Sequence, residues 1–179
     1  MNEKDEMRAW ALRTAGEIPE RRRTESDLAA MRALFALESF KAAKTIFCYV
    51  SVGNEVSTRA ILEAAIGLQK TVCVPRCLTE YTMEAVAIGS IDDLENGMYG
   101  IPTGKQDGHV IPVSMIDFTV LPCLCADARG YRIGYGKGYY DRFLADYKGF
   151  SAVLCRKELL EEQVPAEPHD QKADFVIAT

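Results

Sequence analysis

The sequence predicts an α/β protein of three layers, α/β/α, in which helices cover both faces of a largely parallel or mixed central sheet of the Rossmann-like kind. Three observations carry this prediction. Short apolar runs, typical of buried strands, alternate with longer segments whose apolar residues have helical spacing. Proline stops two of the apolar runs, at Pro75 and Pro122, so loops separate the elements. The 179 residues fit one domain, 1–179, rather than two.

Two helices are expected before the first strand. Residues 3–14 are charged and helix-prone, and Gly16 and Pro19 then interrupt the segment. Residues 19–41 form the second predicted helix, because apolar side chains recur there at helical spacing. Those expected to face the core are Leu28, Met31, Leu34 and Phe35.

Buried strands are predicted at 45–50, 71–74, 82–88, 118–121, 152–155 and 175–177. A helix over 57–70 begins at Ser57, a residue type that caps helices, and a shorter helix covers 138–147. The apolar residues of the 57–70 helix that are expected to face inward are Ile61, Leu62, Ala65 and Leu68. Residues 89–112 contain several glycines and are expected to form a long surface excursion. In folds of this class the ligand site lies beyond the carboxyl ends of the strands.

The charge balance and the hydropathy pattern disfavour several classes of protein. Acidic residues number 26 and basic residues 21, and the resulting formal net charge of −5 disfavours a general nucleic-acid binder. No run approaches the roughly 18 apolar residues of a membrane helix. Residues 1–6 lack the apolar core of a secretory signal. We therefore expect a cytoplasmic protein without nucleic-acid or membrane partners.

The six cysteines are expected to be reduced, buried thiols. None forms a Cys-x-x-Cys pair, and most lie in apolar runs. Such thiols are typical of a cytosolic protein. A zinc site is disfavoured, because His109 and His169 are the only histidines that could add to the ligand set.

A glycine-rich loop carries the strongest functional signal. Four glycines fall within nine residues. They are Gly130, Gly134, Gly136 and Gly138. Glycine lets backbone amides approach a ligand, and the helix that begins here presents free amides and the positive end of its dipole. Together with the charges of Arg132 and Lys137, the loop is suited to a polyphosphate. The alternative is a tight strand-to-helix turn with solvated charges, which the combination of Arg132, Lys137 and Asp141 in one loop makes the weaker interpretation.

Neither of the common nucleotide-binding loops fits. A P-loop needs Gly-x4-Gly-Lys-Ser/Thr, but Tyr131 occupies the first glycine position and Gly138 follows the lysine. A dinucleotide-binding loop needs Gly-x-Gly-x-x-Gly, and the spacing from Gly134 onward differs from it. Kinase-type and dehydrogenase-type functions therefore lose support.

The run from Asp127 to Leu144 resembles the signature of the 5-formyltetrahydrofolate cyclo-ligase family, also called methenyltetrahydrofolate synthetases. That signature reads roughly Phe-Asp-x-x-Gly-x-Arg-Leu-Gly-x-Gly-x-Gly-Tyr-Tyr-Asp, and this chain has Ala126 for the phenylalanine and Ile133 for the leucine. Further matches follow in family order and span nearly the whole chain. They are Lys4 with Arg8, residues 49–56, Gly100-Ile101-Pro102, and residues 164–170. Thr103-Gly104 departs from the Glu-Pro that often follows in the family.

The resemblance implies a reaction and its co-substrate. The family converts 5-formyltetrahydrofolate to 5,10-methenyltetrahydrofolate with MgATP, and releases ADP and phosphate. The formyl oxygen is a poor leaving group, so its phosphorylation explains the need for ATP. No enzyme nucleophile is required, and catalysis is expected to rest on positioning and charge stabilisation. A monomer is expected from the same resemblance.

The resemblance also assigns roles to individual residues. Lys137 and Arg132 are the expected catalytic residues, although Arg132 has the alternative role of holding the loop through Asp127. The expected ATP-binding residues are Lys4, Arg8, Arg132, Gly134, Gly136, Lys137, Gly138, Tyr139 and Tyr140, with core packing equally expected for Tyr140. The expected substrate-binding residues are Val50, Glu55, Tyr135 and Tyr139. Asp141 and Asp170 are the expected Mg²⁺ ligands, since this ion favours few carboxylates plus phosphate oxygens.

Two other functions remain open at this stage. A non-catalytic module of a related fold that binds a phosphorylated ligand would keep the glycine loop. It has no need for Lys4, Arg8, Glu55 and Asp170 together, so their joint presence favours an enzyme. A family member that acts on a different formylated, pterin-like substrate is compatible with the Thr103-Gly104 departure.

Overall fold

A seven-stranded sheet forms the centre of the computed structural model, which describes residues 2–179. The strand order is β12-β10-β7-β1-β2-β3-β6. The strands are β1 (Thr45–Cys48), β2 (Thr71–Cys77), β3 (Met83–Ile88), β6 (Val110–Ile111), β7 (Phe118–Leu121), β10 (Phe150–Cys155) and β12 (Phe175–Ala178). The pairs from β12 to β2 are parallel, whereas β3 pairs antiparallel with both β2 and β6. The predicted mixed, largely parallel sheet is therefore confirmed.

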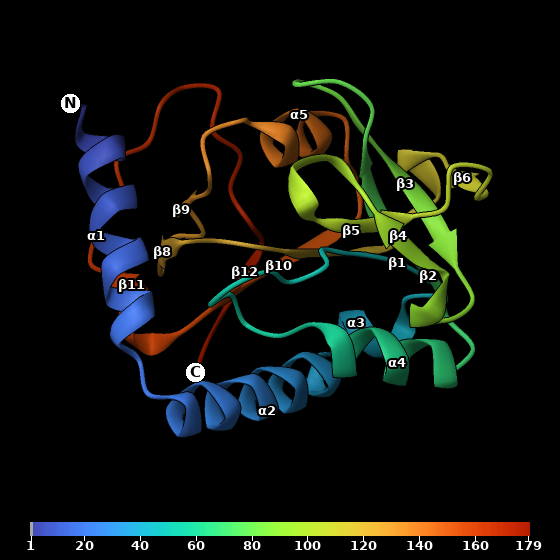
Figure 1. Ribbon diagram of the computed structural model, residues 1–179, viewed down its shortest axis with the longest axis horizontal. Helices are drawn as coiled ribbons and strands as arrows, with labels where there is room; N and C mark the ends of the chain where they lie inside the picture. Colours follow the sequence, from blue (N-terminus) through green and yellow to red (C-terminus); the bar gives the residue numbers. More distant parts are fainter. Residues whose placement is uncertain (1) are drawn as a thin grey trace.

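Helices lie on both faces of this sheet, as predicted (Figure 1). They are α1 (Glu3–Glu17), α2 (Glu20–Ala36), α3 (Glu38–Ala42), α4 (Arg59–Gly67) and α5 (Tyr139–Ala145). One face is covered by α2, α3 and α4, whose buried residues pack with Ile46 and Cys48 of β1. The other face carries α1 and α5, which pack with Phe47. Successive residues of a strand point to opposite faces, so Ile46, Phe47 and Cys48, which are buried between the two helix layers, must be apolar.

Two small sheets and four single-turn helices complete the fold. The first sheet contains β8 (Cys125–Asp127), β9 (Arg132–Ile133) and β11 (Leu160–Glu161), and the second contains β4 (Leu94–Asn96) and β5 (Pro102–Gly104). The 3-10 helices are η1 (Ile91–Asp93), η2 (Met98–Gly100), η3 (Val113–Met115) and η4 (Lys157–Leu159). The segment predicted as a surface excursion, 89–112, thus contains short strands, and one of them joins the main sheet.

The predicted second helix is divided in two at Leu37, which has extended backbone angles and ends α2. The prediction that Leu28 faces the core is wrong, since its side chain is exposed. The buried residues of α2 are Ser26, Ala30 and Leu34, which recur every fourth position along one face. Leu28 lies two residues from the first two of them and therefore points to the opposite side of the helix. Small residues, rather than the largest apolar ones, let α2 approach the sheet.

Three further predictions about elements need correction. Ser57 does not cap α4, because the helix begins at Arg59 and its N-cap position is Thr58. Leu68 is exposed, because the helix has already ended at Gly67. Pro75 does not stop its strand, since β2 continues to Cys77 in antiparallel pairing with β3. Pairing with β1 ends at Cys73, so the missing amide hydrogen of Pro75 interrupts no bond on that side.

The prediction that Gly16 interrupts the first helix is wrong, because α1 continues through it to Glu17, and the remaining predictions about the fold agree closely with the structure. The helix predicted at 138–147 is the shorter α5. All six cysteines are free thiols, and four of them are buried. Within residues 2–179, the helices are too short or too polar to cross a membrane.

A buried carboxylate fixes the turn between β8 and β9. Asp127 has no exposed surface, and its oxygens accept hydrogen bonds from the amides of Arg129 (2.9 Å), Tyr131 (3.2 Å) and Val164 (2.9 Å). The Arg129 guanidinium donates to the same carboxylate at 2.6 and 3.0 Å. Burial alone would raise the pKa of Asp127, but these donors outweigh it and hold the pKa below its usual value. Asp127 thus ties the turn to the segment around Val164.

We expect Asp127→Asn to lower the free energy of unfolding by about 3 kcal/mol, because an amide group would face the Arg129 charge and several N–H donors. Urea denaturation of the variant measures this loss. The exposed Asp107→Asn provides the matched control, with a change below about 0.5 kcal/mol. Because the folded-state pKa of Asp127 is lowered, its stabilisation is present at neutral pH and disappears as pH falls through that value. A variant as stable as the parent at neutral pH would contradict this role.

Candidate active site

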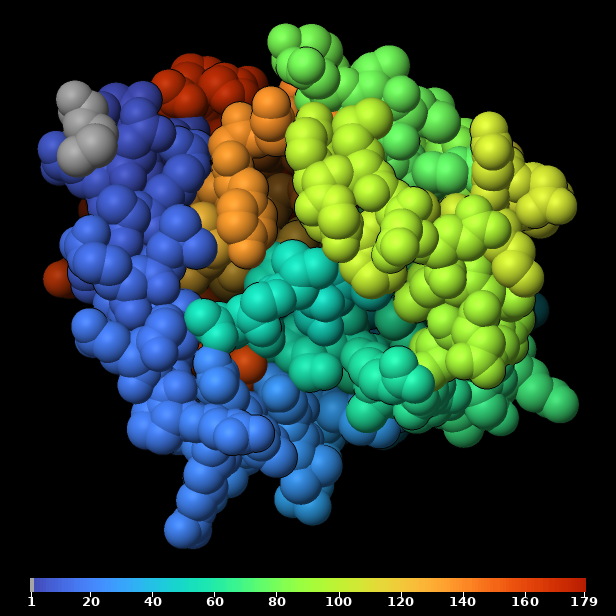
Figure 2. All heavy atoms as spheres, viewed as in Figure 1, coloured from blue at the N-terminus to red at the C-terminus, as the bar shows by residue number. Residues whose placement is uncertain are grey.

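Three segments meet beyond the carboxyl ends of adjacent parallel strands. The β1 loop (residues 49–58) follows β1, the glycine loop (residues 127–138) follows β7 and β8, and the C-terminal segment (residues 162–174) follows β10 and β11. Figure 2 shows that the surface is hollowed between the glycine loop in orange, the β1 loop in teal and the yellow-green chain just before β5. This position agrees with the prediction that the site lies at the carboxyl edge of the sheet.

The glycine loop depends on glycine at two positions in particular. Gly130 has a φ of +93°, and a Cβ placed on it would lie 2.3 Å from the carbonyl oxygen of Ala173. Gly136 has a φ of +88°, and a Cβ there would lie 3.2 Å from Cζ of Arg8. A side chain at Gly130 is excluded by a backbone clash, while one at Gly136 would press on a charged side chain. The glycines therefore bring the loop close to the C-terminal segment and to α1.

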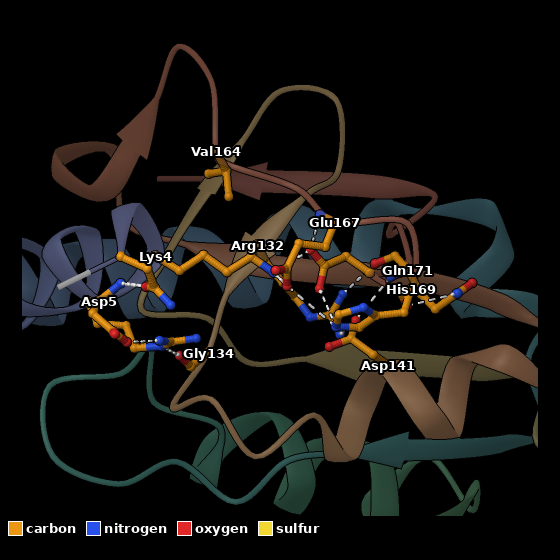
Figure 3. Close-up of polar contacts among 12 residues, drawn as sticks. Lys4, Asp5, Arg132, Gly134, Asp141, Val164, Glu167, His169 and Gln171 are labelled. Atoms are coloured by element: carbon orange, nitrogen blue, oxygen red, sulfur yellow. Dashed lines mark hydrogen bonds and ion pairs between the residues drawn. The ribbon is translucent and has the colours of Figure 1, made fainter.

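The first turns of α1 contact both of these segments. Lys4 Nζ lies 2.6 Å from Asp170 Oδ2 and 2.7 Å from Glu167 Oε2. Arg8 Nε donates to the carbonyl oxygen of Gly134 at 3.0 Å, and the same guanidinium pairs with Asp5. Lys4 and Arg8, which we predicted to share a helix face, thus both point toward the site. Figure 3 shows α1 beside the C-terminal segment, with Asp5 and Gly134 close together.

The Lys4 contacts shift the pKa values of both partners. Burial would lower the pKa of Lys4, but the hydrogen bonds with Asp170 and Glu167 outweigh burial and raise it. Burial would raise the pKa of Asp170, but Lys4 and the amide of Glu167 outweigh burial and lower it. Both groups are therefore charged at neutral pH, and a cation already lies against the Asp170 carboxylate.

Arg132 is held between α5 and the C-terminal segment. Its side chain is only 5% exposed, and Nη2 lies 3.2 Å from Asp141 Oδ1. Nη1 donates to the carbonyl oxygen of Gln171 at 2.7 Å, and the Gln171 amide donates to Asp141 Oδ1 at 3.1 Å. The alternative in which Arg132 holds the loop through Asp127 is therefore wrong, because Arg129 is the partner of Asp127. Figure 3 shows Arg132 and Asp141 directed toward the chain around Gln171.

Lys137 lies at the exposed tip of the glycine loop. Its ammonium group is 5.8 Å from the centre of the Tyr99 ring, and among residues 2–179 no carboxylate forms an ion pair with it. Tyr139, the first residue of α5, donates from its hydroxyl to the carbonyl oxygen of Thr79 at 2.6 Å. Gly138 precedes it as the N-cap of α5, with a left-handed φ of 66°. Lys137 therefore presents an unneutralised positive charge beside the Tyr99 ring.

Glu55 provides an acidic group on the β1 loop, which borders the hollow. Its Oε2 accepts a hydrogen bond from the amide of Val52 at 2.8 Å. Burial raises the pKa of Glu55 to about 7, although the Val52 hydrogen bond acts in the other direction. Burial and, to a smaller extent, the Glu55 charge raise the pKa values of Tyr49, Tyr135 and Tyr140, so the carboxylate acts on the charge state of these three tyrosines. Glu55 therefore changes charge near neutral pH.

Tyr140 and Val50 make mainly packing contacts. The Tyr140 ring centre lies 6.3 Å from that of Phe47, and the residue packs against both core clusters. Val50 packs against the cluster beneath α2, α3 and α4. Of the two roles that we considered for Tyr140, core packing is the one these contacts favour.

Oxygen-rich side chains suitable for a hard cation lie in the C-terminal segment. Potential ligand atoms of Glu167, His169 and Asp170 all lie within 4.8 Å of one another. Asp141 joins this region through its bond with the amide of Gln171, the residue after Asp170. Carboxylates supply nearly all these donors, and no cysteine contributes, so the group fits Mg²⁺ better than zinc.

Two features of the site were not predicted from the sequence. Tyr99, beside Lys137, has a left-handed φ of 61°, a strained conformation for a tyrosine. Its position next to Gly100-Ile101-Pro102 is the signal that could have identified it. Gln171, which binds both Arg132 and Asp141 through its backbone, gives no such signal. Backbone contacts do not depend on residue type.

Comparison with known proteins agrees with this geometry. The model of the 5-formyltetrahydrofolate cyclo-ligase family matches residues 1–179. A probable 5-formyltetrahydrofolate cyclo-ligase of Schizosaccharomyces pombe is 24% identical, covering 97% of this chain and 94% of the relative. The 5-formyltetrahydrofolate cyclo-ligase of Mycolicibacterium smegmatis is 28% identical, with 97% and 92% covered.

Solved structures show the same fold. The 5,10-methenyltetrahydrofolate synthetase of Aquifex aeolicus superimposes with a TM-score of 0.87 at 25% identity, covering 98% of this chain and 89% of that one. A 5,10-methenyltetrahydrofolate synthetase from Mycoplasma pneumoniae gives a TM-score of 0.79 at 20% identity, with 98% of both chains covered. With the family match over its full length, the chain belongs to the 5-formyltetrahydrofolate cyclo-ligase family.

Proposed function

We propose that this chain catalyses the ATP-dependent cyclisation of 5-formyltetrahydrofolate to 5,10-methenyltetrahydrofolate, with release of ADP and phosphate. One observation carries the proposal: the glycine loop, which carries the exposed Lys137, and the β1 loop, which carries the acid Glu55, border the same hollow (Figure 2). Two ligands of different chemistry can therefore meet there. The free thiols fit a reducing compartment such as the cytoplasm, and we expect the enzyme to act as a monomer.

The phosphate side comprises the glycine loop and its cationic neighbours. Lys137 has no competing carboxylate among residues 2–179, so its charge is available for the γ-phosphate. Arg8 already contacts the carbonyl oxygen of Gly134, which places its guanidinium at the loop. Lys4 forms an ion pair with Asp170 of the C-terminal segment, and Arg132 forms one with Asp141 of α5. We propose that these side chains, with the loop amides, bind ATP.

The folate side comprises Glu55 and the tyrosines around it. An ionised carboxylate accepts hydrogen bonds from the N–H groups of a pterin ring. Tyr135 lies in the glycine loop, which borders the hollow, and Tyr139 begins α5 directly after that loop, so we propose that both contact the ring system between Glu55 and the phosphates. Val50 adds an apolar contact at the start of the β1 loop.

The chemistry then requires two displacements. The formyl oxygen attacks the γ-phosphorus of ATP, and ADP leaves. N10 of the same substrate attacks the formyl carbon, the N10 proton is lost, and phosphate departs with the former formyl oxygen. Lys137 and Arg132 stabilise the negative charge on the transferred group, since positioned cations are most effective where charge develops.

The donor set of the site fits Mg²⁺. Asp141 Oδ1 is bound by Arg132 and the Gln171 amide, which leaves Oδ2 for another ligand. Asp170 already accepts one cation, the Lys4 ammonium group. We propose that Asp141 and Asp170 hold Mg²⁺, which when bound offsets charge on the ATP phosphates.

The direct test of this function uses purified protein with ATP, magnesium and 5-formyltetrahydrofolate. The ultraviolet absorbance of the methenyl product should rise, and omission of ATP should prevent the rise. If ATP binds but the product never forms, a non-catalytic binding module or a different formylated substrate becomes the better description.

Lys137→Ala should lower kcat/KM for ATP by about a hundredfold or more, because it removes a cation from the developing phosphoryl charge. Its exposed position predicts an unchanged midpoint of thermal unfolding. Lys148→Ala, also exposed, is the matched control and should retain parental kinetics. Normal turnover by a folded Lys137→Ala variant would remove this residue from the phosphate site.

Glu55→Gln should weaken binding of 5-formyltetrahydrofolate by about tenfold or more, while ATP affinity is retained. Ionised Glu55 accepts hydrogen bonds from the pterin ring more strongly than its protonated form does, so folate affinity of the parent should rise as pH increases through about 7. The variant should lack this pH dependence. Isothermal titration of each ligand from pH 6 to 8 measures both effects, and equal loss of ATP and folate affinity would point to a damaged loop instead.

Asp141→Asn should raise the magnesium concentration needed for half-maximal activity by about tenfold, because an amide is a poorer ligand for a hard cation. Activity is measured across a magnesium titration at saturating ATP and folate. Asp146→Asn, at the exposed end of α5, controls for the loss of a charge from the helix. A titration curve that matches the parent would exclude Asp141 as a magnesium ligand.

A further inference from the structure

The β1 loop reaches far from the strand that it follows. Near β1 it is fixed by local bonds: the Tyr49 hydroxyl donates to the carbonyl oxygen of Val56 at 2.7 Å. Ser51 and Thr58 each donate from the amide to the other's side-chain oxygen at 3.0 Å. These bonds close the base of the loop. They leave the carbonyl groups at its tip to find partners elsewhere.

Those partners come from Arg156, the residue directly after β10. Its side chain is only 2% exposed. Nη2 donates to the carbonyl oxygen of Glu55 at 2.8 Å, and Nε donates to that of Asn54 at 3.2 Å. Nη1 donates to the carbonyl oxygen of Arg23 in α2 at 3.0 Å. One guanidinium therefore joins the tip of the β1 loop to α2 and to the end of β10.

Asp27 of α2 completes this arrangement. Its Oδ1 lies 2.9 Å from Nη2 of Arg156 and accepts a hydrogen bond from the amide of Ser57 at 3.0 Å. Arg156 thus binds carbonyl groups of the β1 loop, while Asp27, its ion-pair partner, binds an amide of the same loop. We name these two side chains the Arg156–Asp27 clamp.

The contacts of Arg156 indicate a role in geometry rather than in charge. The guanidinium is nearly inaccessible, and its nitrogens are committed to the backbone and to Asp27. A planar group with donors at fixed angles orients several carbonyl groups at once, which a lysine ammonium cannot reproduce. Removal of these donors would leave buried carbonyl groups unpaired, so the loop would adopt another conformation.

We propose that Arg156 is a positioning residue for substrate binding, which acts by holding the backbone of Glu55 so that its carboxylate faces the hollow. This inference rests on the proposed function, in which Glu55 contacts the pterin ring. It adds a residue that lies outside the motifs of the sequence analysis and touches neither ligand. The clamp sets the affinity for folate and has no contact with the glycine loop where ATP is proposed to bind.

Arg156→Lys keeps the charge and removes the planar set of donors. The dissociation constant for 5-formyltetrahydrofolate should increase about tenfold, and that for ATP should stay within about twofold of the parent. Arg22→Lys is the matched control. Arg22 lies in the same helix as Asp27 and pairs with Glu158 just beyond Arg156, but its pair does not include the β1 loop. Folate affinity of this control should equal that of the parent.

A double-mutant cycle separates positioning from general structural damage. If Arg156 acts through Glu55, Arg156→Lys should change folate affinity by less than about twofold in a Glu55→Gln background. An equal loss in both backgrounds, or no loss in either, would overturn the proposal. If Glu55→Gln alone leaves folate affinity unchanged, the proposed contact of Glu55 fails first, and the role of Arg156 fails with it. Should Arg156→Lys not fold, Asp27→Asn undergoes the same cycle with the same criteria.

Discussion

The parallel pairing of β10, β7 and β1 is the constraint on which the site depends. Val120 of β7 lies opposite Cys48 of β1 and Ala152 of β10, so the three strands run at the same level and in the same direction. Their following loops must emerge at one edge of the sheet. Segments more than 100 residues apart in the chain therefore meet there, without any sequence motif that encodes the meeting.

The two ends of the chain are drawn to the same edge. Lys4 and Asp170 are 166 residues apart and form an ion pair with side chains that are each 15% exposed. Partial burial strengthens the attraction between the two charges, but it also removes water from both of them, so the pair leaves charges that a ligand can reorganise. Lys4 with Asp170 and Arg132 with Asp141 therefore neutralise one another, whereas Lys137 forms no ion pair among residues 2–179.

Much of this arrangement follows from local patterns in the sequence. The strands were predicted because residues buried on both faces must be apolar, and the glycine loop because four glycines cluster with charged residues. Gly130 and Gly136 in this loop indeed adopt backbone angles that other residues avoid. The spacing of apolar residues failed to predict burial in α2, where the distance between the helix and the sheet decides which side chains fit. Leu28 was expected inside, but Ser26 and Ala30 occupy the sheet-facing side of α2, where small residues let the helix approach.

Polar contacts between residues far apart in the sequence could not be predicted either. Nothing near Arg132 in the sequence indicates that its partners are Asp141 and Gln171 rather than Asp127. Arg156 follows an apolar strand and reads as an ordinary charged residue at its end, although it is almost fully buried in the structure. Its carbonyl partners on the β1 loop carry no residue-specific signal, so only the folded chain identifies the contact.

If both ligands react in this hollow, the formyl oxygen of the substrate must be transferred to phosphate. Substrate labelled with heavy oxygen in the formyl group tests this directly, by mass analysis of the phosphate released during turnover. Direct attack of the formyl oxygen on ATP predicts one labelled oxygen in each phosphate. Methenyl product accompanied by unlabelled phosphate would show that ATP is hydrolysed by water, and would contradict a site in which the two ligands join.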